Sequence, residues 1–170
     1  MIPALGCILL LAACEGAKLP PTPTPLPAVT PTFPIPDLES VLLRTSNLPA
    51  RVTSAEISYT PHPSLADLPD AQYFVSLQFL QGTQFGGRVS VFLYANPADM
   101  DAAWPAILNT IATPKEIDDI GDLAVVNFSD LVFIRCSALV HIKLVGTQPE
   151  ELRIYASQLD ARFTPLVCQP

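Results

Sequence analysis

The segment from Leu19 to Pro36 most narrows what this chain can fold into. It holds eight prolines, with threonines between them. Proline fixes φ and lacks a backbone donor, so the segment can join neither a helix nor a sheet. An extended polyproline-like chain rises ~3.1 Å per residue, which gives a tether with a reach on the order of 50 Å. A packed core is therefore restricted to residues 37–170, which are enough for one domain.

A short apolar run, Ala4 to Ala13, precedes this tether and ends in Leu11-Ala12-Ala13-Cys14. It is too short to span a bilayer, which takes ~20 residues, but it fits the hydrophobic part of a secretory signal. The four residues resemble the lipobox of bacterial lipoproteins. The resemblance implies a signal peptide over residues 1–13, a lipid such as palmitate on Cys14, a tether over 14–36 and an extracytoplasmic domain over 37–170. The start of the chain lacks the Lys or Arg of such signals, and the alternative is a buried apolar helix with an incidental cysteine.

The charge of the chain bears on its partners. The formal net charge is −7, and every charged side chain follows Cys14. An acidic surface argues against nucleic acid and against docking on anionic lipid headgroups. We therefore expect the membrane to be contacted through the N-terminal lipid anchor alone.

The four cysteines fall into three groups. Cys7 lies in the signal, and Cys14 is the lipid site. Cys136 and Cys168 remain as an even pair in an oxidising compartment, which favours a disulfide. Closing that segment would stabilise the fold by ~3 kcal/mol. The alternative is one buried thiol and one free thiol near the C-terminus.

Hydrophobic periodicity predicts the elements of the domain. Strands are expected over residues 52–59, 73–80, 88–95, 123–128, 131–136 and 139–145. Helices are expected over residues 38–45, from Asn96 onward and after Pro149, with Pro105 kinking or splitting the second of them. The order favours an α+β fold, with an antiparallel sheet and helices packed on one face. Strands followed by a helix occur twice, which suggests a pseudo-repeat.

Several short motifs resemble those of a group of bacterial lipoproteins. They are Asn47-Leu48-Pro49, the loop Ile120-Gly121-Asp122-Leu123-Ala124 and the strand Phe133-Ile134-Arg135. The same motifs are similar to the sensor ectodomains of bacterial Ser/Thr kinases and to PsbP-like domains. Leu123 stands where the group often has Glu, and Cys136 stands where it often has Arg. The resemblance implies a non-enzymatic binding or sensing domain and carries over no site residues.

Candidate sites are few. No nucleophile, nucleotide or metalloprotease motif is present, and we expect no catalytic residue and no cofactor. His62 and His141 are interpreted as surface histidines without a catalytic partner. The candidates for ligand binding are Trp104 and Tyr94, beside the helix that begins after Asn96. The acidic loop offers Asp118, Asp119 and Asp122 as calcium ligands, against the alternative of a solvated loop.

The sequence leaves two classes of function open. The first is a tethered, non-catalytic binding or sensor module that takes a small ligand or an envelope component. The second is a structural or assembly partner of another cell-envelope protein. An apolar cavity near Trp104 would favour the first, and a closed core without a pocket would favour the second.

Overall fold

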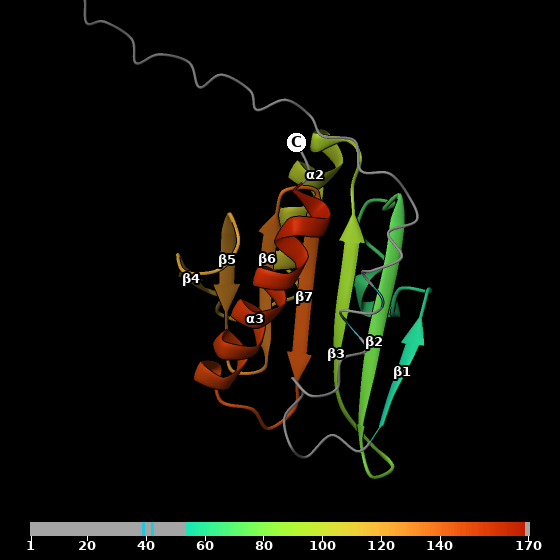
Figure 1. Cartoon of the computed structure of the whole chain (residues 1–170), viewed down its shortest axis with the longest axis vertical. Helices are drawn as coiled ribbons and strands as arrows, with labels where there is room; N and C mark the ends of the chain where they lie inside the picture. The colour runs from blue at the N-terminus through green and yellow to red at the C-terminus, as the bar shows by residue number, and fades with distance from the viewer. Residues whose placement is uncertain (1–38, 40–41, 43–53, 169–170) are drawn as a thin grey trace, which may run out of the picture.

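The computed structural model describes Glu39, Leu42 and residues 54–168. The lipobox, the tether and most of the helix expected over residues 38–45 lie outside these residues. The described part is an antiparallel seven-stranded sheet with two α-helices, so the α+β class is confirmed (Figure 1). The strands are β1 (Ser54–Ser58), β2 (Tyr73–Gln81), β3 (Gln84–Leu93), β4 (Lys115–Ile117), β5 (Leu123–Val126), β6 (Asp130–Arg135) and β7 (Ala138–Leu144). The helices are the 3-10 turn η2 (Pro63–Leu65), α2 (Pro97–Leu108) and α3 (Pro149–Val167).

Two runs of neighbouring strands meet in the middle of the sheet. The strand order is β1-β2-β3-β7-β6-β5-β4, and every neighbouring pair is antiparallel. The pairing of β3 with β7 joins the two runs and sets Arg88 beside Lys143 and Ser90 beside His141. Strand β4 was not expected from the sequence, because its three residues carry no clear alternation.

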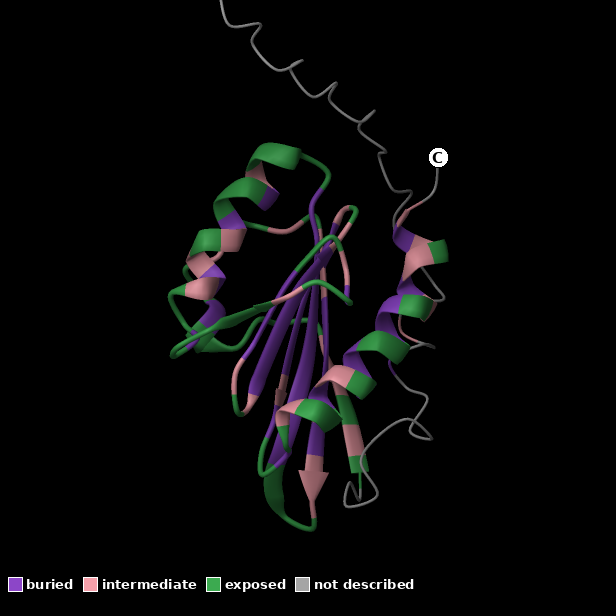
Figure 2. Ribbon diagram, turned by 90° about the vertical axis from the view of Figure 1, so that its left-hand side faces the viewer, coloured by how far each residue is buried: buried purple, intermediate pink, exposed green. Residues whose placement is uncertain are grey.

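The two α-helices lie on opposite faces of the sheet, with the strands between them (Figure 2). The expectation that both pack on one face is therefore wrong. The central strands are apolar on both sides: on β6, Phe133 packs in the cluster under α3, and Val132 packs in the cluster under α2. One helix can cover only one of these faces, so the second face needs a helix of its own.

The expected pseudo-repeat holds for the strands but not for the helices. The strand triplets β1-β2-β3 and β5-β6-β7 are each followed by a helix and meet at the antiparallel β3–β7 pair. A two-fold axis between antiparallel strands runs perpendicular to the sheet, and it would place both helices on the same face. Their opposite placement means that the likeness of the two halves ends with the strands.

Helix α2 begins as the sequence predicts. The Asn96 side chain accepts a hydrogen bond from the Ala98 backbone N–H at 3.0 Å, and Pro97 and Asp99 follow in the first turn. Pro105 lies inside the helix without splitting it. At 12 residues, α2 is roughly 18 Å long, whereas the ten residues of β3 extend over roughly 33 Å. The helix therefore covers only part of its face of the sheet.

The predicted disulfide is present. Cys136 and Cys168 are bonded, with their Cα atoms 5.4 Å apart. Cys136 lies in the turn between β6 and β7, and Cys168 follows the last residue of α3. The bond thus fixes the end of α3 to one end of the sheet. In the described residues, no helix has both the length and the apolar character needed to cross a membrane.

Candidate functional site

The part of the sheet that α2 leaves uncovered carries polar side chains. Strand pairing places Gln78, Arg88, Lys143 and Asp130 side by side on four successive strands, β2, β3, β7 and β6. Residues two apart on a strand share a face, so all four lie on the face of the sheet that α2 covers. The apolar cluster under α2 includes Phe92 and Leu139, which lie nearer the helix on the same strands. The polar row begins where that cluster ends.

These residues line a hollow of about 350 Å³. The sheet forms its floor, His62 and η2 form one wall, and Thr110, which follows α2, forms another. The lining residues are His62, Ser64, Leu65, Gln78, Phe85, Arg88, Thr110, Asp130, His141 and Lys143. The hollow thus combines four kinds of charged or titratable group with two apolar side chains.

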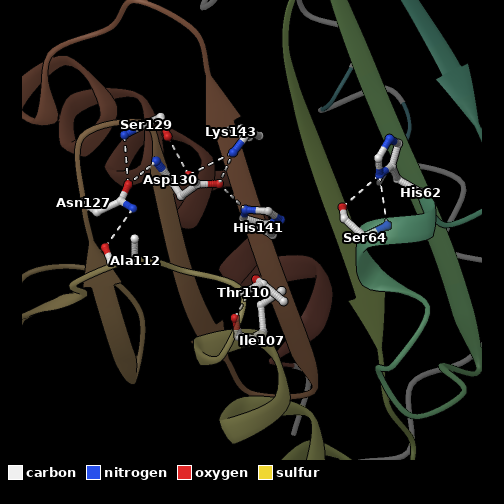
Figure 3. Close-up of polar contacts among 10 residues, drawn as sticks. All are labelled: His62, Ser64, Ile107, Thr110, Ala112, Asn127, Ser129, Asp130, His141 and Lys143. Carbon is white, nitrogen blue, oxygen red and sulfur yellow. Dashed lines mark hydrogen bonds and ion pairs between the residues drawn. The ribbon is translucent and has the colours of Figure 1, made fainter.

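Asp130 is the centre of a hydrogen-bonded cluster on one side of the hollow (Figure 3). Its carboxylate lies 2.8 Å from His141 Nε2 and 3.1 Å from Lys143 Nζ, and it accepts from Ser129 Oγ at 2.6 Å. The Asp130 backbone N–H also donates to Asn127 Oδ1 at 2.7 Å. Burial opposes the charge, but the hydrogen bonds from His141 and Ser129 lower the pKa of Asp130 to about 2. The Asp130 carboxylate is therefore ionised and already accepts hydrogen bonds from three side chains of the protein.

Arg88 differs from Asp130 in its hydrogen bonding. Its residue is only 6% exposed, and its Nε finds no hydrogen-bond partner within the described part of the chain. Burial lowers the pKa of Arg88, against a smaller effect of the Asp130 charge. By contrast, Arg135 and Arg153 each pair with a carboxylate. A buried guanidinium nitrogen without a partner is unusual, because buried charged groups are normally paired and hydrogen-bonded.

His62 stands at the rim, on the β2 side of the hollow. Its Nδ1 accepts from the Ser64 backbone N–H at 3.1 Å and caps the η2 turn (Figure 3). Desolvation and the nearby charge of Arg88 lower the pKa of His62. The ring therefore stays neutral at neutral pH and keeps η2 in place beside the hollow.

The ligand-binding candidates Trp104 and Tyr94 do not line this hollow. Tyr94 is buried, and its hydroxyl donates to the Pro69 carbonyl at 3.2 Å; burial raises its pKa to about 12. Trp104 packs partly buried against the cluster under α2. Both residues belong to the packing between α2 and the sheet.

The acidic loop forms ion pairs with arginines. Asp119 pairs with Arg153 at 2.7 Å, and Asp122 pairs with Arg135 at 2.8 Å while accepting from the Cys136 backbone N–H. The charge of Asp118 adds to the effects that raise the pKa of Arg153, of which the hydrogen bond to Asp119 is the largest. Within the described residues, no three His, Cys, Asp or Glu side chains are grouped so as to hold a metal ion.

The interpretation of His141 as a surface residue without a partner is wrong. The ring is 5% exposed and its partner is Asp130. The sequence held a signal for this site: Arg88 and Ser90 alternate with Val89 and Val91, just as His141 and Lys143 alternate with Val140 and Ile142. The sequence could not show that these two strands are neighbours, because they are far apart along the chain.

The chain matches no protein-family model, no curated protein and no solved structure. Its site is therefore interpreted from its own residues.

Proposed function

We propose that this chain is a lipid-anchored extracytoplasmic protein whose domain binds a small ligand in the hollow, as a binding or sensor module without catalysis. The single observation that carries the proposal is the Nε of Arg88 in the floor of the hollow, which is buried and has no hydrogen-bond partner among the described residues. Leaving a buried charged donor without an acceptor costs folding free energy. A ligand with an acceptor group recovers that cost when it binds.

The surroundings of the hollow support binding better than catalysis. A nucleophile needs a general base within hydrogen-bond reach, about 2.6–3.2 Å. Ser90 lies beside His141 on the neighbouring strand, but its hydroxyl is fully buried and makes no hydrogen bond in the described structure. The Ser129 hydroxyl donates to Asp130, whose pKa of about 2 makes this carboxylate a weak general base. The side chains of the hollow are thus arranged to hold a molecule.

The anchor is proposed on the sequence alone. Replacing Cys14 with serine removes the thiol that would carry the lipid, and we expect the protein in the medium or as an uncut precursor. Fractionation of cells with an antibody against the domain measures this. Cys7→Ser is the matched control, because that cysteine is lost with the signal peptide. Membrane attachment of Cys14→Ser equal to that of the parent chain would contradict the anchor.

Binding in the hollow is tested by blocking it. Gln78 lies beside Arg88 on β2, so Gln78→Trp places an indole across the floor. The full chain in detergent is incubated with an extract of culture medium, washed and analysed by mass spectrometry for retained small molecules. We expect the parent chain to retain a compound that Gln78→Trp does not retain.

Glu56→Trp is the matched control for this experiment. Glu56 is the neighbour of Gln78 on β1, but it is exposed and lies outside the hollow. It should retain the same compound as the parent chain. Retention by all three proteins would place binding elsewhere, and retention by none would favour the assembly-partner function.

A further inference from the structure

The charge balance of the hollow points to a class of ligand. We infer that the ligand is a small organic monocarboxylate whose carboxylate binds the guanidinium of Arg88. This inference rests on the proposed binding function and names what the hollow selects.

The hollow carries one unbalanced positive charge. Apart from the two histidines, its charged side chains are Arg88, Lys143 and Asp130, so two cations face one carboxylate. Lys143 and Asp130 are already paired with each other, at 3.1 Å. Arg88 is therefore the cation left for the ligand, in a chain whose net charge is −7.

The single negative charge of a monoanion balances the positive charge of Arg88, whereas the charge of a phosphate monoester exceeds it. A carboxylate matches the planar fork of an arginine, and the two form paired hydrogen bonds. Phosphate carries roughly −1.5 to −2 charges at neutral pH. Its second charge would face Asp130, whose low pKa keeps it ionised and whose burial strengthens the repulsion.

The rest of the lining indicates a small molecule with an apolar part. Leu65 of η2 and Phe85 of β3 supply apolar surface to the lining. The Thr110 hydroxyl donates to the Ile107 carbonyl at 2.7 Å, so its oxygen faces the hollow mainly as an acceptor. The volume of about 350 Å³ is near the lower end of the ~300–1,000 Å³ usual for ligand pockets.

Acetate tests the inference directly, because it carries the carboxylate and little else. The side-chain Nε–H resonance of Arg88 is followed by NMR in the full chain in detergent, at constant ionic strength. We expect a saturable shift with sodium acetate, no shift with acetamide, its neutral isostere, and weaker binding of inorganic phosphate. Acetate binding by the Arg88 variants is followed through the Gln78 side-chain amide.

Three variants distinguish acetate binding by the Arg88 guanidinium from a general effect of net charge. Arg88→Gln is expected to weaken acetate binding roughly tenfold or more, since a charge-assisted hydrogen bond is lost. Arg153→Gln removes the same charge from α3 on the other face and should leave the affinity unchanged. If Arg88→Gln fails to fold, Arg88→Met serves in its place, and its melting temperature should be no lower than that of the parent chain.

Several results would contradict the inference that the ligand is a monocarboxylate. They are tighter binding of phosphate than of acetate, equal shifts with acetamide and acetate, no shift with acetate, or unchanged acetate affinity in the Arg88 variants. A neutral compound retained by the parent chain and lost in Gln78→Trp would uphold the binding function while overturning this inference.

Discussion

Replacing Asp130 with alanine is expected to lower the free energy of unfolding by about 3 kcal/mol. Asp130 is 6% exposed, and its carboxylate receives hydrogen bonds from His141, Lys143 and Ser129. Its removal leaves these groups without an acceptor at the edge of the core. Urea denaturation followed by circular dichroism measures the loss.

The effect of this substitution should depend on pH. The pKa of Asp130 in the folded chain is about 2, below its ordinary value of 3.8. A lowered pKa means that the carboxylate stabilises the fold above pH ~4, and that this contribution fades as the pH falls toward ~2. The difference between the parent chain and Asp130→Ala should therefore shrink over that interval.

Asp119→Ala is the matched control for Asp130→Ala. It removes a carboxylate from the exposed pair with Arg153, and exposed pairs contribute little to stability. Equal losses from the two variants would mean that the cluster around Asp130 adds nothing beyond a surface ion pair.

Removing the disulfide is expected to cost about 3 to 4 kcal/mol by the chain-entropy relation. The bond closes a segment with a sequence separation of 32 residues. The double variant Cys136→Ser with Cys168→Ser should lose this stability in chemical denaturation. The parent chain treated with reductant should lose a similar amount.

The double variant also provides the control for reductant. Its stability should not change when reductant is added, because it has no bond there to break. Intact mass after alkylation gives the second readout. Two labelled thiols at Cys136 and Cys168 without reductant would show that the bond does not form.

The elements with local signals could be predicted from the sequence. Alternation located β2, β3, β6 and β7 to within a few residues, and the Asn96-Pro97 pair located the start of α2. The buried stripes of α2 and α3 follow the three- and four-residue spacing of apolar side chains, such as Met100, Ala103 and Ile107. These signals depend only on neighbours along the chain, so the sequence alone is enough to predict the elements.

The site depends on contacts that local patterns do not encode. Arg88 and Lys143 meet only because β3 pairs with β7, and that pairing also decides which helix covers which face. The alternation predicts a strand that begins at Leu131, whereas β6 begins at Asp130, which lies opposite Lys143. Trp104 and Tyr94, the candidates for ligand binding, both contribute to the packing between α2 and the sheet.

A crystal structure of the full chain with the retained compound tests the binding site most directly. We expect the compound in the hollow, with a carboxylate oxygen within hydrogen-bond distance of the Arg88 guanidinium and the Asp130–His141 contact unchanged. The compound bound elsewhere on the domain, with Arg88 still lacking an acceptor, would contradict it.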